Sequence, residues 1–149
     1  MSNILIIGGA GLVGSNMVLY LLDHGQSELV LDDLCTGYPD AVPVGMLICG
    51  SAGNARLLDE IFSSHKIQAV MHFAGSIEVA ESVRALSEYY FNNLGNTLLL
   101  LDAMVRHGVG KFVFSSTAAI LGTPEYVPVD EAHVKNPINP YGRSKWLIE

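Results

Sequence analysis

Short apolar runs alternate with segments of helical spacing along this chain, and that rhythm limits its fold more than any other feature. Five apolar runs have the length of buried strands, and they lie at residues 3–7, 29–31, 46–49, 69–73 and 111–115. Three intervening segments have the spacing of helices, at residues 12–24, 54–65 and 87–107. Strands that alternate with helices build βαβ units with right-handed crossovers. The sequence therefore predicts the α/β class, with a doubly wound parallel sheet.

A glycine-rich turn stands between the first expected strand and the first expected helix. Gly8, Gly9, Gly11 and Gly14 satisfy both a G-x-G-x-x-G and a G-x-x-G-x-x-G pattern. Such glycines permit a tight turn and a close approach to a pyrophosphate, and the helix N-terminus offers free N–H groups with partial positive charge. The sequence predicts a Rossmann-type dinucleotide site here, and a purely structural glycine turn is the alternative.

An acidic residue at the end of the second expected strand supports the dinucleotide hypothesis. Asp32 follows Gly14 by 18 residues (32 − 14), near the spacing of about 20 that is expected for a ribose-binding acid. Its carboxylate can accept hydrogen bonds from the adenosine hydroxyls, whereas it would repel a 2′-phosphate. Because Asp33 adds a second negative charge, the sequence predicts NAD rather than NADP as the cofactor.

Tyr141 and Lys145 are spaced i, i+4, so they share one face if a helix begins at Pro140. Asn139 before that proline is typical of a helix N-cap. A nearby ammonium lowers the pKa of a phenol toward the range of a useful acid or base. Thr117, just past the fifth expected strand, can place a hydroxyl beside the same substrate oxygen. We therefore predict Tyr141, Lys145 and Thr117 as catalytic residues.

Composition and charge exclude several classes of protein. The formal net charge of −7 argues against nucleic acid and anionic membrane surfaces as partners. Hydrophobic residues make up 50% of the chain and charged residues only 15%, which is typical of a sheet buried on both faces or of apolar surface meant for a partner. Cys35 and Cys49 have no metal-ligand or disulfide spacing, and no signal peptide is recognisable, so we expect a cytoplasmic protein with reduced thiols and no metal.

The motifs, in their order along the chain, resemble the extended short-chain dehydrogenases/reductases. Within that family they are most similar to the nucleotide-sugar epimerases that interconvert UDP-glucose and UDP-galactose. The matching segments span the chain at residues 8–15, 31–34, 72–75, 81–82, 89–93, 114–117 and 139–145.

The resemblance implies an NAD-dependent 4-epimerase that works through a 4-keto sugar, represented here by an N-terminal part that we expect to be inactive alone. It implies that Tyr141 takes the proton of the sugar 4-hydroxyl, that Thr117 shares this hydrogen bond, and that Lys145 holds the nicotinamide ribose and tunes Tyr141. The cofactor-binding residues that it implies are Gly8, Gly11, Leu12, Val13, Gly14, Asp32, Asp33, Ser51, Ala52, Phe73, Ala74, Gly75, Asn92, Ser115, Tyr141 and Lys145.

Some positions depart from the family or separate its branches. Related dehydratases and decarboxylases carry an acid just after the catalytic threonine, whereas Ala118 follows Thr117 here, which favours the epimerases. Ser51 stands where a carboxylate usually contacts adenine, and Glu78 lies near the place of a phosphate-binding lysine.

Family members continue well beyond this length. The resemblance therefore implies that residues 1–149 are an incomplete NAD-binding Rossmann domain, truncated after the fifth strand and without the C-terminal substrate domain. A UDP-hexose is the implied substrate, and a second copy or the C-terminal half is the expected protein partner. Two alternatives stay open: an NAD-binding module without turnover, and an assembly fragment that pairs through its open sheet edge.

We interpret His72, in the fourth expected strand, as a core histidine with a backbone partner.

Overall fold

The computed structural model describes residues 3–149, and these divide into two compact units. Unit 1 contains the described residues up to Ala74 together with Asn96–Ser115. Unit 2 contains Gly75–Gly95 and Ser116–Glu149. The predicted glycine loop lies in unit 1, and all three predicted catalytic residues lie in unit 2.

Unit 1 is built on a parallel sheet of five strands in the order β3-β2-β1-β4-β5. The strands are β1 (Asn3–Ile7), β2 (Ser27–Asp32), β3 (Leu47–Cys49), β4 (Ile67–His72) and β5 (Phe112–Phe114). The chain starts in the centre, moves outward to β3, and then returns across β1 to β4 and β5. This reversal next to β1 is the switch point of a doubly wound sheet, and it confirms the predicted fold class.

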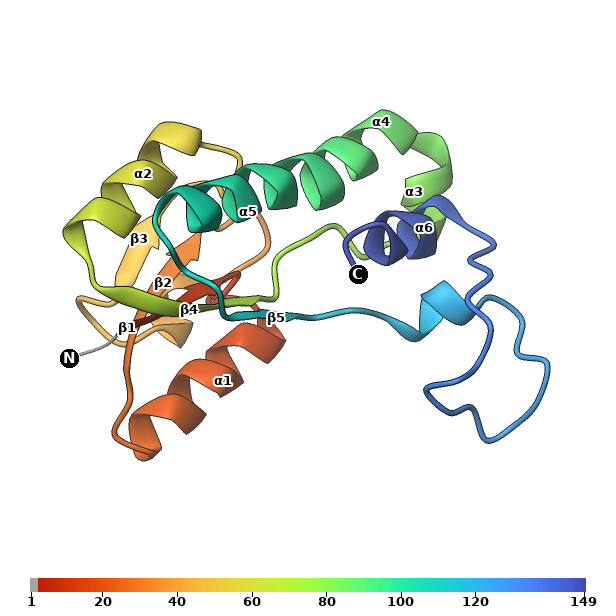
Figure 1. Ribbon diagram of the computed structural model, residues 1–149, viewed down its shortest axis with the longest axis horizontal. Coiled ribbons are helices and arrows are strands. Elements are labelled where there is room, and N and C mark those ends of the chain that lie inside the picture. Colours follow the sequence, from red (N-terminus) through yellow and green to blue (C-terminus); the bar gives the residue numbers. More distant parts are fainter. Residues whose placement is uncertain (1–2) are drawn as a thin grey trace. The chain divides into compact units, whose positions relative to one another are not determined.

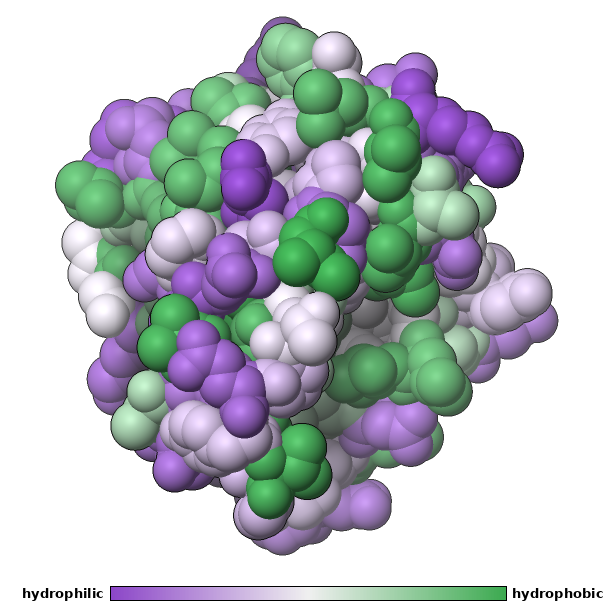
Figure 2. All heavy atoms as spheres, turned by 90° about the vertical axis from the view of Figure 1, so that its right-hand side faces the viewer, coloured by the Kyte–Doolittle hydropathy of each residue, from purple (hydrophilic) through white to green (hydrophobic). Residues whose placement is uncertain are grey.

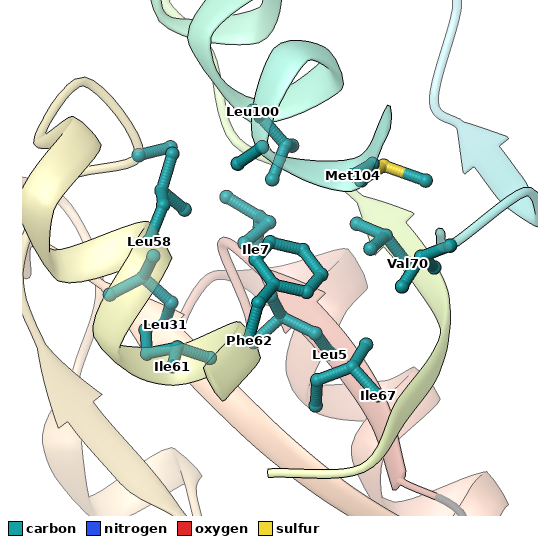
Figure 3. Close-up of a cluster of buried hydrophobic side chains, with 13 residues drawn as sticks. Leu5, Ile7, Leu31, Leu58, Ile61, Phe62, Ile67, Val70, Leu100 and Met104 are labelled. Atoms are coloured by element: carbon teal, nitrogen blue, oxygen red, sulfur yellow. The ribbon is translucent and has the colours of Figure 1, made fainter. Parts of the chain in front are cut away.

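Helices cover both faces of this sheet (Figure 1). Helix α1 (Leu12–Asp23) packs on one face, where Val18 joins Ile6 and Val30 in a small core. Helices α2 (Ala55–Ser64) and α5 (Asn96–Arg106) cover the other face. There the side chains from β1, β2 and β4 meet those of the two helices in the larger core (Figure 3), whose labelled members are Leu5, Ile7, Leu31, Leu58, Ile61, Phe62, Ile67, Val70, Leu100 and Met104.

The larger core predicts a clear difference between two leucines of α5. Leu100 is fully buried, whereas Leu98 is 56% exposed on the same helix. We expect Leu100→Ala to lower the free energy of unfolding by about 2–5 kcal/mol, because the cavity is not refilled. Urea denaturation measures this loss, and Leu98→Ala is the control, with an expected change within about 0.5 kcal/mol. Equal effects of the two substitutions would contradict the assignment of this core.

Two predicted helix ends are confirmed by their caps. The side chain of Asn54 accepts a hydrogen bond from Leu57 N at the start of α2. Asn139 accepts one from Gly142 N at the start of α6 (Pro140–Trp146), and Pro140 occupies the first turn. In both cases a polar side chain satisfies an N–H group that the helix leaves free.

The prediction of one helix over residues 87–107 is wrong. The segment divides into α4 (Leu86–Tyr89), a π-helical segment η2 (Tyr90–Gly95) and α5, and it is preceded by an unpredicted helix, α3 (Val79–Arg84). Asn93 explains the bulge, because its buried side chain bonds the backbone of Ser76 instead of facing solvent. Such π segments are rare and occur frequently at functional sites.

The remaining elements of the chain are short. Two 3₁₀ turns, η1 (Pro39–Ala41) in unit 1 and η3 (Ala118–Leu121) in unit 2, interrupt the loops. Among the described residues, no helix has the length and apolar character needed to cross a membrane. Figure 2 shows hydrophobic side chains (green) gathered between hydrophilic ones (purple) on the face at the right of Figure 1. The large exposed hydrophobic residues of unit 2 include Ile77, Val83, Phe91, Ile138 and Leu147.

Candidate cofactor and catalytic site

The glycine loop packs so tightly in unit 1 that two of its glycines have no room for a side chain. Gly8 has a φ of +80°, and a Cβ there would lie 2.5 Å from the backbone nitrogen of Ala74. A Cβ on Gly14 would lie 2.2 Å from the carbonyl oxygen of Gly8. These contacts bring the start of α1 against the loop and bring the loop against Ala74, two residues beyond the end of β4.

Gly11 is different, because nothing among residues 3–149 requires a glycine there. Its φ is −81°, and an added Cβ would meet only the Gly8 oxygen at an ordinary 3.5 Å. Within residues 3–149, no acceptor takes the N–H groups of Leu12 and Val13 that follow at the start of α1. Both residues are exposed, Leu12 to 83% and Val13 to 59%. A phosphate that approaches these N–H groups needs the space a Cβ would fill, so the loop fits a dinucleotide pyrophosphate.

Asp32 does more than the sequence indicated. It is 8% exposed, and its carboxylate accepts hydrogen bonds from Ala10 N at 2.9 Å and Leu34 N at 2.8 Å. It therefore ties the glycine loop to the end of β2. Because each carboxylate oxygen has two lone pairs, Asp32 keeps acceptor capacity for a ribose hydroxyl. Asp33 is exposed, and its carboxylate accepts from Cys35 N.

The other predicted cofactor residues of unit 1 follow the strands at their carboxyl ends. Ser51 and Ala52 come after β3, and the Ser51 hydroxyl oxygen accepts from Gly53 N at 3.0 Å. Phe73 and Ala74 extend β4, and both donate their N–H groups to the Ile7 carbonyl. Ligands of open α/β sheets gather at this edge. Ser115 also stands there, with its N–H bonded to the His72 carbonyl.

Asn93 is the centre of a buried network in unit 2 that sequence reasoning missed. Its Oδ1 accepts from Ser76 N at 2.8 Å, and its Nδ2 donates to Ser76 O at 3.1 Å and to Ser144 Oγ at 3.0 Å. Ser144 in turn donates to the Tyr141 carbonyl. Asn92, a predicted cofactor residue, donates to Ser76 Oγ at 2.8 Å. The network fixes α6, which carries Tyr141 and Lys145, to the loop that begins at Gly75.

Lys145 is 3% exposed, and burial lowers the pKa of its ammonium from 10.5 to about 8. Gly75 makes room for it, since a Cβ there would lie 3.2 Å from Lys145 Nζ and 3.0 Å from Asn93 Oδ1. The φ of Gly75 is +147°, which also favours glycine. A lysine with a lowered pKa near a tyrosine is typical of a functional site.

The buried Lys145 predicts an unusual dependence of stability on pH. Its folded pKa lies below its unfolded value, so between about pH 8 and 10.5 the unfolded chain binds more protons and stability rises with pH. Below that window the cost of burying the charge is fully present. We expect Lys145→Met to be the more stable protein at neutral pH, with an advantage that shrinks by roughly 2–3 kcal/mol toward pH 10. Urea denaturation across this range measures the gap, and a constant gap would contradict the prediction. The exposed Lys66→Met is the control.

Tyr141 and Thr117 lie on elements of unit 2 that contact each other closely. A Cβ on Gly142 would lie 2.5 Å from the Ala119 carbonyl oxygen, so glycine lets α6 pack against η3. Thr117 caps η3, and its Oγ1 accepts from Ala119 N at 3.2 Å. Among the described residues no side chain or backbone group forms a hydrogen bond with the hydroxyl hydrogen of Thr117 or with the hydroxyl of the half-buried Tyr141. Both groups are therefore available to a substrate.

Other candidate groups have structural explanations. His72 is buried as predicted, and its Nε2 contacts the Thr97 hydroxyl at 2.9 Å. Cys35 and Cys49 are free and exposed. Within the described part of the chain, no group of His, Cys, Asp or Glu side chains could hold a metal ion.

The fold and these features are typical of a dinucleotide-binding α/β protein that carries a tyrosine and a lysine on one helix. The chain matches the NAD dependent epimerase/dehydratase family over residues 4–149, and it belongs to that family. The predicted resemblance is thus confirmed, and so is NAD as the cofactor of the family.

Named relatives sharpen this assignment. The chain is 46% identical over 148 residues to the UDP-glucose 4-epimerase of Rhizobium meliloti (strain 1021), across 99% of this chain and 45% of that protein. It superposes on the Brucella ovis UDP-glucose 4-epimerase in complex with NAD with a TM-score of 0.96, at 39% identity, covering 99% of this chain and 46% of that one. The Thermotoga maritima enzyme with UDP-glucose gives a TM-score of 0.93 at 36% identity, covering 98% and 48%. The chain therefore spans less than half the length of these relatives.

Proposed function

We propose that this chain supplies the cofactor-binding and proton-transfer residues of an NAD-dependent nucleotide-sugar 4-epimerase that interconverts UDP-glucose and UDP-galactose. The proposal rests on two features of this chain, which belongs to the epimerase/dehydratase family. It has a glycine loop with open space at Gly11, and it has a helix with Tyr141 and Lys145 that packs against the turn capped by Thr117. The Thermotoga maritima relative, solved with UDP-glucose, supports the choice of substrate.

The cofactor would be held by the backbone at Gly11–Gly14, with Asp32 and Asp33 selecting an unphosphorylated ribose. We propose Ser51, Ala52, Phe73, Ala74, Gly75, Asn92, Ser115 and Lys145 as its further contacts. Bound NAD supplies a hydride acceptor that returns the hydride to the same carbon. The Ser51 hydroxyl can donate a hydrogen bond to adenine, although it lacks the charge of the usual carboxylate.

Tyr141 moves the proton in this proposal. Its phenolate takes the proton of the sugar 4-hydroxyl and becomes a phenol, which gives the proton back after the 4-keto sugar has turned over. The Lys145 ammonium stabilises the phenolate, and burial makes this charge effective because little water screens it. Thr117 donates its free hydroxyl hydrogen to the same oxygen. Ala118 offers no second acid, so elimination of water is not favoured.

The proposal is tested in a fusion of residues 1–149 to the remaining, C-terminal part of the Rhizobium meliloti relative. We expect this fusion to convert UDP-galactose to UDP-glucose, and we expect Thr117→Val to lower kcat by about 10-fold or more, since one transition-state hydrogen bond is lost. The fusion protein is first checked for folding by its cooperative unfolding. A folded fusion without epimerase activity would contradict the proposal.

We also propose that unit 2 has a protein partner, either a second copy of the chain or the polypeptide that corresponds to the rest of the relatives. Its exposed hydrophobic side chains include Ile77, Val83 and Phe91, and such surface usually marks an interaction site. The edge strand β5 is a weaker candidate, since it has only three residues. Measurement of mass against concentration tests self-association, and a monomer at every concentration would exclude the second copy.

A further inference from the structure

Glu149 joins three segments of unit 2 through one carboxylate. Its Oε1 accepts a hydrogen bond from Ser116 Oγ, and its Oε2 is paired with the ammonium of Lys135. The hydrogen bond from Lys135 lowers the pKa of the Glu149 carboxyl most, and the hydrogen bond from Ser116 lowers it further. The group is therefore ionised at neutral pH, and both of its oxygens are engaged within unit 2.

The positions of these partners connect Glu149 to the proposed catalytic residues. Ser116 directly precedes Thr117, and Glu149 lies four residues after Lys145, just beyond the end of α6. A second contact lies near the start of α6, where Gly142 meets the Ala119 carbonyl. Thr117 therefore lies between two residues that are in contact with α6 or its end. Ser116 bonds Glu149, just beyond α6, and the Ala119 carbonyl lies against Gly142 in the first turn of α6.

We infer that Glu149 is a positioning residue that, through Ser116, sets the Thr117 hydroxyl relative to Tyr141 and Lys145. The inference rests on the proposed function, because Thr117 needs a defined position only if it shares a substrate oxygen with Tyr141. Glu149 touches neither the substrate nor the cofactor in this account. It acts through the hydrogen bond to Ser116, and Lys135 holds the carboxylate in place.

The solvent exposure of the Lys135–Glu149 ion pair favours a positioning role over a role in stabilising the fold. The side chains of Lys135 and Glu149 are 39% and 24% exposed, and ion pairs with that much solvent contribute little to stability. Misplacement of a reacting group, in contrast, lowers rates strongly, by up to about 100-fold for 1 Å. Loss of Glu149 is therefore expected to affect turnover more than folding.

The first test is kinetic and uses the fusion protein described above. Ser116→Ala and Glu149→Ala are each expected to lower kcat by about 10-fold, with KM within about twofold of the unmodified protein. The double variant should be no slower than Glu149→Ala, because the two residues act through one bond. Glu149→Gln should restore part of kcat, since its amide oxygen can accept from Ser116. The exposed Glu131→Ala, in the loop that contains Lys135, is the control and should keep full activity.

Unchanged kcat in Glu149→Ala, or additive losses in the double variant, would overturn the inference. A second measurement does not need activity: the NMR resonances of Thr117 and Ala119 are recorded in the 149-residue chain. Glu149→Ala and Ser116→Ala should shift them in the same way, whereas Glu131→Ala should not. If the unmodified fusion is inactive, the proposed function fails, and these resonances still decide the positioning role. Unmoved Thr117 resonances in Glu149→Ala would refute it.

Discussion

Replacement of Tyr141 by Phe is expected to lower kcat of the fusion protein by about 10²–10⁴-fold, which is the range for loss of a general acid or base. Phe cannot remove or return the proton of the sugar hydroxyl. The rest of the site should persist, because α6 is held by Asn139 at its cap and by Ser144, and neither contact uses the phenol. NAD affinity and the midpoint of urea unfolding should therefore stay close to those of the unmodified protein.

The matched control for this prediction is Tyr90→Phe, which removes the same hydroxyl from another half-buried tyrosine of unit 2. Turnover by the Tyr90 variant should match that of the unmodified protein. Two measurements suffice: initial rates with UDP-galactose, and calorimetric titration with NAD. If Tyr141→Phe retained full turnover, its assignment as the proton carrier would be wrong. Loss of NAD binding in the same variant would mean that the residue serves the cofactor instead.

The second large effect is expected at the glycine loop. Gly14→Ala places a methyl group where the Gly8 carbonyl oxygen would be only 2.2 Å away. The start of α1 must then move away from the loop, and the N–H groups at Leu12 and Val13 move with it. We expect NAD affinity to fall at least about 100-fold, and the free energy of unfolding to fall by about 1–3 kcal/mol, as is typical of overpacking.

Gly110→Ala is the control for this second prediction. Gly110 lies in the same unit, has no positive φ, and has nothing within 4 Å of an added Cβ. Calorimetric titration with NAD and urea denaturation are applied to both variants. Unchanged NAD affinity in Gly14→Ala would show that the loop does not hold the pyrophosphate, and the alternative of a purely structural glycine turn would then stand.

Local sequence signals predicted the elements of unit 1 well. Each strand contains an apolar run that is followed by a polar residue or glycine, and the caps at Asn54 and Asn139 are formed by side chains three residues from their partners. These features depend on neighbours in the chain, so a single sequence contains them. The open space at Gly11 could also be predicted, because the glycine motif itself indicates that a ligand approaches the backbone closely.

Long-range polar contacts could not be predicted in this way. The bond from Asn93 to Ser144 joins residues that are 51 positions apart, and it accompanies the π segment that breaks the expected long helix. Neither spacing nor composition relates such partners. The burial of Lys145 could not be predicted for the same reason. The i, i+4 spacing placed it on the same helix face as Tyr141, but it does not show how deeply that face is buried. The sequence predicted Asp32 as a ribose ligand, whereas its bonds to the backbone of Ala10 and Leu34 became visible only in three dimensions.

The most direct test of the proposed chemistry follows a label at carbon 4 of the sugar. The fusion protein is incubated with UDP-galactose that carries deuterium at C4, and the UDP-glucose formed is analysed by mass spectrometry and NMR. We expect deuterium to be retained at C4 of the product, because the hydride leaves and returns without mixing with water while Tyr141 exchanges only the hydroxyl proton. Loss of the label to solvent would contradict the account, since it would mean that a base removes the C4 hydrogen as a proton.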